Sequence, residues 1–136
     1  MQPRWNTTSS TQWNSYINWS STRKKWSLWE KIACKYLEKN GWSILDTNWT
    51  KLIWEIDIIA KKQEKIHFIE VKLRKSKNYS PATDNLTPTK KKRFLRIGLL
   101  WASFHSLEEE QFQFDCITIE KKVTHWQVSH YRNIEL

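Results

Sequence analysis

Two carboxylates and a lysine stand on neighbouring β-branched segments of this chain. Asp57 lies in the first segment, and Glu70 and Lys72 lie in the second. Because strand side chains alternate, Glu70 and Lys72 share one face. If the two segments form a hairpin that turns near residues 63–64, Asp57 faces Glu70 with Cβ atoms about 5 Å apart. Two carboxylates that close repel each other unless a cation lies between them.

This spacing predicts a site for a divalent cation. Mg²⁺ and Mn²⁺ prefer oxygen ligands, so Asp57 and Glu70 are the candidate ligands, together with the backbone carbonyl of Val71. Lys72 could orient or deprotonate water, or stabilise developing negative charge. Glu30, early in a predicted helix, could add another carboxylate. The alternative is a solvated strand face with cross-strand ion pairs, although an unpaired carboxylate among isoleucines is costly to bury.

The elements that must position these residues follow from apolar periodicity and turn residues. Ser27 and Thr87 are the expected N-caps, and Asn40–Gly41 ends the first helix. A loop of about five residues should close the central hairpin. The order α-β-β-β-α-β-β predicts an α/β or α+β fold, with a mixed sheet of about five strands flanked by helices. We expect helices at 27–40 and 88–105, and strands at 42–48, 53–60, 66–73, 112–119 and 123–129.

The charge of the chain favours a polyanionic partner. The net charge is +9, which points first to nucleic acid and second to an anionic membrane surface. Arg74 and Lys75 leave the second arm of the hairpin, and Lys90 and Arg93 open the second helix. Basic clusters beside paired carboxylates predict contacts with a phosphate backbone.

Composition also bounds the organisation. Residues 1–24 are polar and aperiodic, so we expect a disordered tail before one domain at 25–136. No apolar run reaches the roughly 18 residues of a membrane span, and the N-terminus lacks the apolar segment of a signal peptide. Cys34 and Cys116 are expected to be reduced and buried, as in a cytoplasmic protein. The four histidines lack metal-ligand spacing and are expected to pack or face solvent.

Several segments together resemble one known family. Residues 26–37, 54–60 and 69–74 (WSLWEKIACKYL, WEIDIIA and IEVKLR) are similar to G-x-x-G-E-x-x-A-x-x-Y-L, G-E-I-D-L-I-A and F-V-E-V-K-x-R. Lys90 follows Leu86-Thr87-Pro88 as a lysine follows that family's V-T-P turn, and residues 113–119 (QFDCITI) resemble R-F-D-V-V-x-V. The chain thus resembles the YraN-like family, uncharacterised bacterial proteins with a restriction-endonuclease-like fold related to archaeal Holliday junction resolvases.

The resemblance implies a restriction-endonuclease-like core and a metal-dependent nuclease centre. Asp57, Glu70 and Lys72 would form its core and Glu30 its helix-borne acid, with Mg²⁺ or Mn²⁺ as cofactor. The implied substrate is DNA, including branched DNA, and resolvase-like relatives suggest a homodimer. Thr50 and Gln113 depart from the pattern, because the family usually has arginine there.

A further departure concerns glycine. Trp26, Trp29 and Trp54 stand where the family has glycine, and the chain has ten Trp but only two Gly. Average usage is about 7% Gly, whereas Gly and Trp together total 12 of 136 residues here. We hypothesise that some of these Trp codons are UGA, read as glycine in the source bacterium.

The sequence leaves three functions open. The first is hydrolysis of DNA phosphodiesters. The second is a non-catalytic nucleic-acid-binding module of the same fold, because such folds can retain binding without catalysis. The third is a protein-interaction domain that uses exposed tryptophans.

Overall fold

The computed structural model describes residues 27–74 and 86–136. The expected tail at residues 1–24, and Trp26 and Lys75, lie outside these ranges. The elements run in the order α-β-β-β-α-β-β that the sequence predicts, which confirms the α/β fold with a mixed sheet. They are α2 (Leu28–Lys39), β1 (Ser43–Lys51), β2 (Trp54–Lys62), β3 (Lys65–Arg74), α3 (Pro88–Phe104), the short 3-10 helix η2 (Glu109–Gln111), β4 (Phe112–Lys121) and β5 (Trp126–Tyr131).

Both helices begin at the predicted caps. The Ser27 hydroxyl accepts a hydrogen bond from the backbone N–H of Glu30 at 3.3 Å. The Thr87 hydroxyl accepts one from the N–H of Lys90 at 3.2 Å. Each cap satisfies a donor that the first helical turn cannot pair internally. Helix α2 ends before Gly41, whose φ of +85° is a left-handed conformation that glycine adopts without strain.

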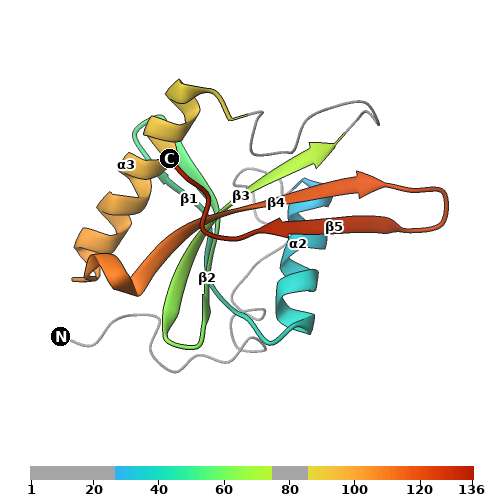
Figure 1. The fold of residues 1–136 in the computed structure, drawn as a ribbon, viewed down its shortest axis with the longest axis horizontal. Helices are drawn as coiled ribbons and strands as arrows, with labels where there is room; N and C mark the ends of the chain where they lie inside the picture. The colour runs from blue at the N-terminus through green and yellow to red at the C-terminus, as the bar shows by residue number, and fades with distance from the viewer. Residues whose placement is uncertain (1–26, 75–85) are drawn as a thin grey trace.

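The strands form one sheet in the order β1-β2-β3-β4-β5. Strands β3 and β4 pair in parallel, whereas the other three pairs are antiparallel. A parallel pair needs a crossover connection, and α3 lies on that crossover. Helices α2 and α3 lie on opposite faces of the sheet (Figure 1).

The hairpin of β2 and β3 is tighter than expected. Ile58 pairs with Ile69, so the predicted register is confirmed, but the predicted loop of about five residues is wrong. Gln63 and Glu64 alone form the turn, with φ of 50° and 66°. A two-residue turn with both residues left-handed matches the twist of the strands. Turns of this kind usually contain Asn-Gly, and because Gln63 and Glu64 differ from that pattern, the sequence did not indicate a two-residue turn.

Other strand boundaries also moved. Strand β1 was expected to end at residue 48 but continues to Lys51, and β5 spans Trp126–Tyr131 where residues 123–129 were expected. In both cases pairing with the neighbouring strand sets the boundary: Lys51 pairs with Trp54, and Tyr131 pairs with Cys116.

Each face of the sheet carries its own apolar core. Under α3 the core includes Phe68, Ile97 and Trp101. Under α2 it includes Leu37 and Ile69. Cys34 and Cys116 are both free and buried, as expected. The strands are therefore held from both sides, and this fixes the side chains at their ends.

Candidate functional site

Asp57 lies where the regular pairing of β2 with β3 stops. The Asp57 Oδ2 atom accepts a hydrogen bond from the backbone N–H of Val71 at 2.9 Å. Ile56 and Ile58 would share a face in a regular strand, yet Ile56 packs in the core under α3 and Ile58 in the core under α2. The alternation therefore breaks at Asp57, and its carboxylate takes a place beside β3 that a backbone carbonyl would normally occupy.

Asp57 and Glu70 form a pair of carboxyl groups. Burial raises the pKa of Asp57 well above its ordinary value, and the charge of Glu70 raises it further, against the opposing effect of the Val71 N–H. Burial also raises the pKa of Glu70, although Lys72, a hydrogen bond with Asp57, and Lys90 oppose the change. The fold thus brings together two acids that resist simultaneous ionisation without a cation.

A pocket of about 180 Å³ opens in front of Glu70. Strands β2 and β3 contribute the acids Glu55 and Glu70 to its lining, and α3 contributes the bases Lys90 and Arg93. Its apolar walls are Ile53, Trp54, Leu86 and Phe94. A ligand with negative charge and a bound cation would meet complementary groups on both sides of this pocket.

The other predicted basic residues, on β3, lie outside the lining of the pocket. Lys72 is half-buried, and its charge lowers the pKa of Glu70, so the two side chains lie near each other. Arg74 is the last residue of β3 and is half-buried. Lys75 follows it, outside the described residues. Neither Lys72 nor Arg74 lines the pocket itself.

Glu30 reaches the same region from α2. Its side chain is buried, and its Oε2 atom has no hydrogen-bond partner among the described residues. Its charge contributes to the raised pKa of Asp57. A buried carboxylate oxygen without a hydrogen-bond partner is a group that a bound cation would satisfy.

The donor set fits Mg²⁺ or Mn²⁺ only with help from solvent or substrate. Within residues 27–74 and 86–136, no three His, Cys, Asp or Glu side chains gather closely enough to hold a metal ion by themselves. Mg²⁺ commonly binds through one or two carboxylates and completes its shell with water and phosphate oxygens. Asp57 and Glu70 meet that requirement. The Val71 carbonyl remains a predicted ligand, while the Val71 N–H is already used by Asp57.

Two of the unusual tryptophans lie in the described residues, and one of them lines the pocket. Trp29 lies in the first turn of α2 and packs against the core beneath that helix. Trp54 lines the pocket, and its buried indole N–H finds no partner in the described chain. Neither residue has a positive φ, so glycine at these positions would not be required by backbone conformation. At Trp54 it would instead leave the pocket wider.

A second polar cluster was not predicted. Asp115 of β4 is fully buried, and its carboxylate accepts hydrogen bonds from His67 Nδ1 at 2.5 Å and His130 Nε2 at 2.8 Å. Gln113 and the backbone N–H of Asn133 donate to its other oxygen, both at 2.9 Å. Burial alone would raise the pKa of Asp115, but these hydrogen bonds hold it well below its usual range. An aspartate between Phe114 and Cys116 in an apolar strand was the available clue.

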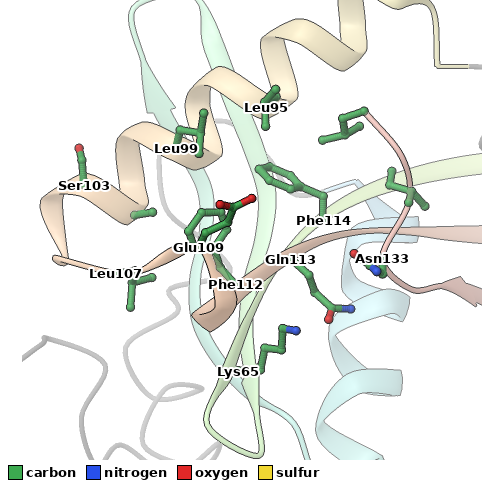
Figure 2. Close-up of a pocket in the computed structure, with 13 residues that line it drawn as sticks. Lys65, Leu95, Leu99, Ser103, Leu107, Glu109, Phe112, Gln113, Phe114 and Asn133 are labelled. Atoms are coloured by element: carbon green, nitrogen blue, oxygen red, sulfur yellow. The ribbon is translucent and has the colours of Figure 1, made fainter.

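A larger hollow of about 710 Å³ lies elsewhere, between α3, the start of β4 and the C-terminal residues (Figure 2). Leu95, Leu99 and Phe112 give it a mainly apolar wall, and Lys65 and Glu109 supply its charges. It lacks the paired acids and bases of the smaller pocket.

No helix in the described parts of the chain is long and apolar enough to cross a membrane.

Comparison with known proteins identifies the family. Residues 29–119 match the model of the uncharacterised protein family UPF0102. A UPF0102 protein of Caldanaerobacter subterraneus is 34% identical over 110 residues, which cover 79% of this chain and 90% of the relative. One from Clostridium beijerinckii is 31% identical over 106 residues, covering 76% and 86%. One from Myxococcus xanthus is 28% identical over 101 residues, covering 74% and 80%. The chain therefore belongs to the UPF0102 family, the YraN-like family that its motifs resemble.

Proposed function

We propose that this protein is a metal-dependent nuclease that hydrolyses phosphodiester bonds of DNA. The observation that carries the proposal is the pocket in which Glu70 meets Lys90 and Arg93, with Asp57 paired to Glu70. In metal-assisted hydrolysis of a phosphodiester, a cation lies near the scissile phosphate and positive charge stabilises the developing oxyanion. The pocket offers carboxylates that could hold a cation, from β2 and β3, and positively charged side chains, from α3.

Each residue has a distinct part in the proposal. Asp57 and Glu70 would hold Mg²⁺ or Mn²⁺, and Glu30 would assist from α2. The bound cation would supply a Lewis acid and a more acidic water. Lys90 and Arg93 would hold phosphates of the DNA backbone, since cationic side chains on α3 line the same pocket. Lys72, close enough to affect Glu70, would position the attacking water or the developing charge.

A second candidate is a nucleic-acid-binding module without catalysis. The observation that favours it is that the described residues do not gather three metal-binding side chains. In that case the carboxyl pair would share a proton, and the basic residues alone would bind phosphate. Binding would then be sensitive to salt but indifferent to metal and to the replacement of Asp57.

The two candidates separate in a cleavage assay. Purified protein is incubated with linear duplex, branched DNA and RNA, with Mg²⁺, with Mn²⁺ or with a chelator. We expect metal-dependent cutting of DNA by the wild type, and its loss in Asp57→Ala and Lys72→Ala. Glu64→Ala, at an exposed turn position, is the matched acid control. Equal cutting by the wild type and both site variants would refute the site, whereas metal-independent binding with no cutting would favour the second candidate.

A further inference from the structure

The turn between β1 and β2 is made of two large aliphatic residues. Lys51 pairs with Trp54, so Leu52 and Ile53 alone form the tip of the hairpin. Leu52 has a φ of 57°, a left-handed conformation that is strained for a leucine. Asn or Gly would serve such a turn at lower cost. The fold therefore gains nothing in its turn geometry from Leu52.

Both side chains face solvent. Leu52 is 90% exposed and Ile53 is 83% exposed. Neither belongs to the two apolar cores of the described chain. Two adjacent aliphatic side chains that are exposed, and one of them strained, suggest a role in contact with a partner.

The position of the tip indicates the chemistry of that partner. Ile53 lines the same pocket as Glu70, Lys90 and Arg93. A molecule that fills this region must present negative charge to the bases of α3 and apolar surface to the tip. Nucleic acid does so, because the flat faces of its bases lie within a few ångströms of its phosphates. The net charge of +9 favours the same partner.

We propose that Leu52 and Ile53 form an apolar wedge that inserts between bases where a nucleic acid is unpaired or weakly stacked. Leucine and isoleucine are among the side chains that proteins insert between base steps. This inference rests on the proposed function and defines its substrate: the pocket would act on a phosphate beside an opened step. A fully paired duplex would be a poorer substrate, because its bases must first be unstacked at a cost in free energy, whereas the bases of an unpaired step are already unstacked.

The test uses the full-length chain and a double variant, Leu52→Asn with Ile53→Ser. Asparagine tolerates the left-handed conformation, so the turn should be retained. The control is Val123→Asn, an exposed aliphatic residue (102%) at the β4–β5 turn, which projects away from α3 (Figure 1). The probes are a duplex with a short unpaired bubble and the matched duplex, each with the fluorescent base aminopurine in the tested step. The fluorescence measurements are made in chelator, and the cleavage assays are made with Mg²⁺.

We expect the wild type and Val123→Asn to raise aminopurine fluorescence in the bubble by about twofold, as unstacking does, and the double variant to leave it unchanged. The wild type should also cut the bubble about tenfold faster than the duplex, and the double variant should lose that preference. Equal fluorescence for the wild type and the double variant, with DNA bound in both, would overturn the wedge. A double variant that changes only the sedimentation of the protein would also overturn it, and would assign the tip to protein association.

These outcomes are separable from the fate of the proposed function. The fluorescence arm needs no metal and no cleavage, so an inactive protein that still unstacks the bubble through Leu52 and Ile53 supports the wedge while refuting hydrolysis. Metal-dependent cutting with no difference between bubble and duplex in any variant supports hydrolysis while refuting the wedge. A wild type that binds neither probe at low salt refutes both.

Discussion

The backbone N–H of Val71 donates to the Asp57 carboxylate at 2.9 Å, and this hydrogen bond ties the acid of β2 to the strand that carries Glu70. Val71 directly follows Glu70, so the bond holds the two carboxyl groups together. It stabilises the ionised form of Asp57, against burial and the charge of Glu70, which both favour the protonated form. The net result is a pKa of Asp57 well above its ordinary value.

The first prediction is that Asp57→Asn stabilises the protein when no divalent cation is present. A carboxyl group with a raised pKa contributes stability fully below its unfolded pKa of about 3.9, and loses it as the pH rises through the folded value. At neutral pH the wild type therefore carries an unfavourable pair. The amide can still accept from Val71 and can donate to Glu70. We expect the free energy of unfolding, measured with urea in chelator, to rise by about 1 kcal/mol, the usual size of the effect of one substitution.

The same pair of proteins tests the metal. Addition of Mg²⁺ or Mn²⁺ should raise the melting temperature of the wild type, because a ligand that binds only the folded state stabilises it. Asp57→Asn should show little or no rise. An equal rise in both proteins would remove Asp57 from the metal site.

The second prediction concerns Lys90 and Arg93. Replacing either residue with alanine should weaken DNA binding at all sequences and reduce the slope of log K against log salt by about 1. Lys92→Ala is the matched control, since Lys92 is exposed on the same helix but does not line the pocket. Titrations by fluorescence anisotropy at several salt concentrations give the slopes. A control that loses as much as Arg93→Ala would indicate diffuse attraction instead of a pocket.

The proximity of Asp57 and Glu70 could be predicted because hairpin register depends on local arithmetic, although regular pairing stops one residue short of them, at Ile58 and Ile69. Once the turn is placed near residues 63–64, the facing positions follow whether the loop has two residues or five. The helices were predictable for a similar reason, because Ser27 and Thr87 act on donors three residues away. Local chemistry was sufficient in each case.

The third prediction is that Asp115→Asn destabilises the fold at neutral pH. The carboxylate accepts four hydrogen bonds, and an amide would present a donor to His67, His130 or Gln113. Loss of one partner from a buried ionic network costs about 3 kcal/mol. The lowered pKa of Asp115 means that its contribution is present above about pH 3.9 and is lost as the pH falls through the folded value. Urea unfolding of both proteins at neutral and at acid pH should therefore show a difference that narrows in acid.

The Asp115 cluster escaped prediction because its members are distant in the sequence. His67 lies on β3, Asp115 on β4 and His130 on β5, and the parallel pairing of β3 with β4 brings the first two together. No spacing rule connects them. The pocket was not predicted for the same reason. Glu55 and Arg93 line one cavity only because α3 packs over β2, and the sequence motifs that suggested the acids and the bases did not show that they share it.

The fourth prediction is that the coding DNA carries UGA at Trp26, Trp29 and Trp54, and that peptide mapping of the native protein finds glycine there. In the structure, Trp54 crowds the pocket and leaves its indole N–H unpaired. We expect Trp29→Gly with Trp54→Gly to fold and to cut DNA at least as fast as the tryptophan form. UGG at all three codons would refute the idea.

The crossover through α3 has a consequence for the order of assembly. Strands β1, β2 and β3 are joined by two-residue turns, so they can pair through contacts that are close in the sequence, and such contacts form early. Strand β4 can join β3 only after α3 has been made. During synthesis Asp57 and Glu70 should therefore come together while Lys90 and Arg93 are still inside the ribosome, so the nascent chain passes through a stage that carries the two acids without the bases of α3 that line the pocket.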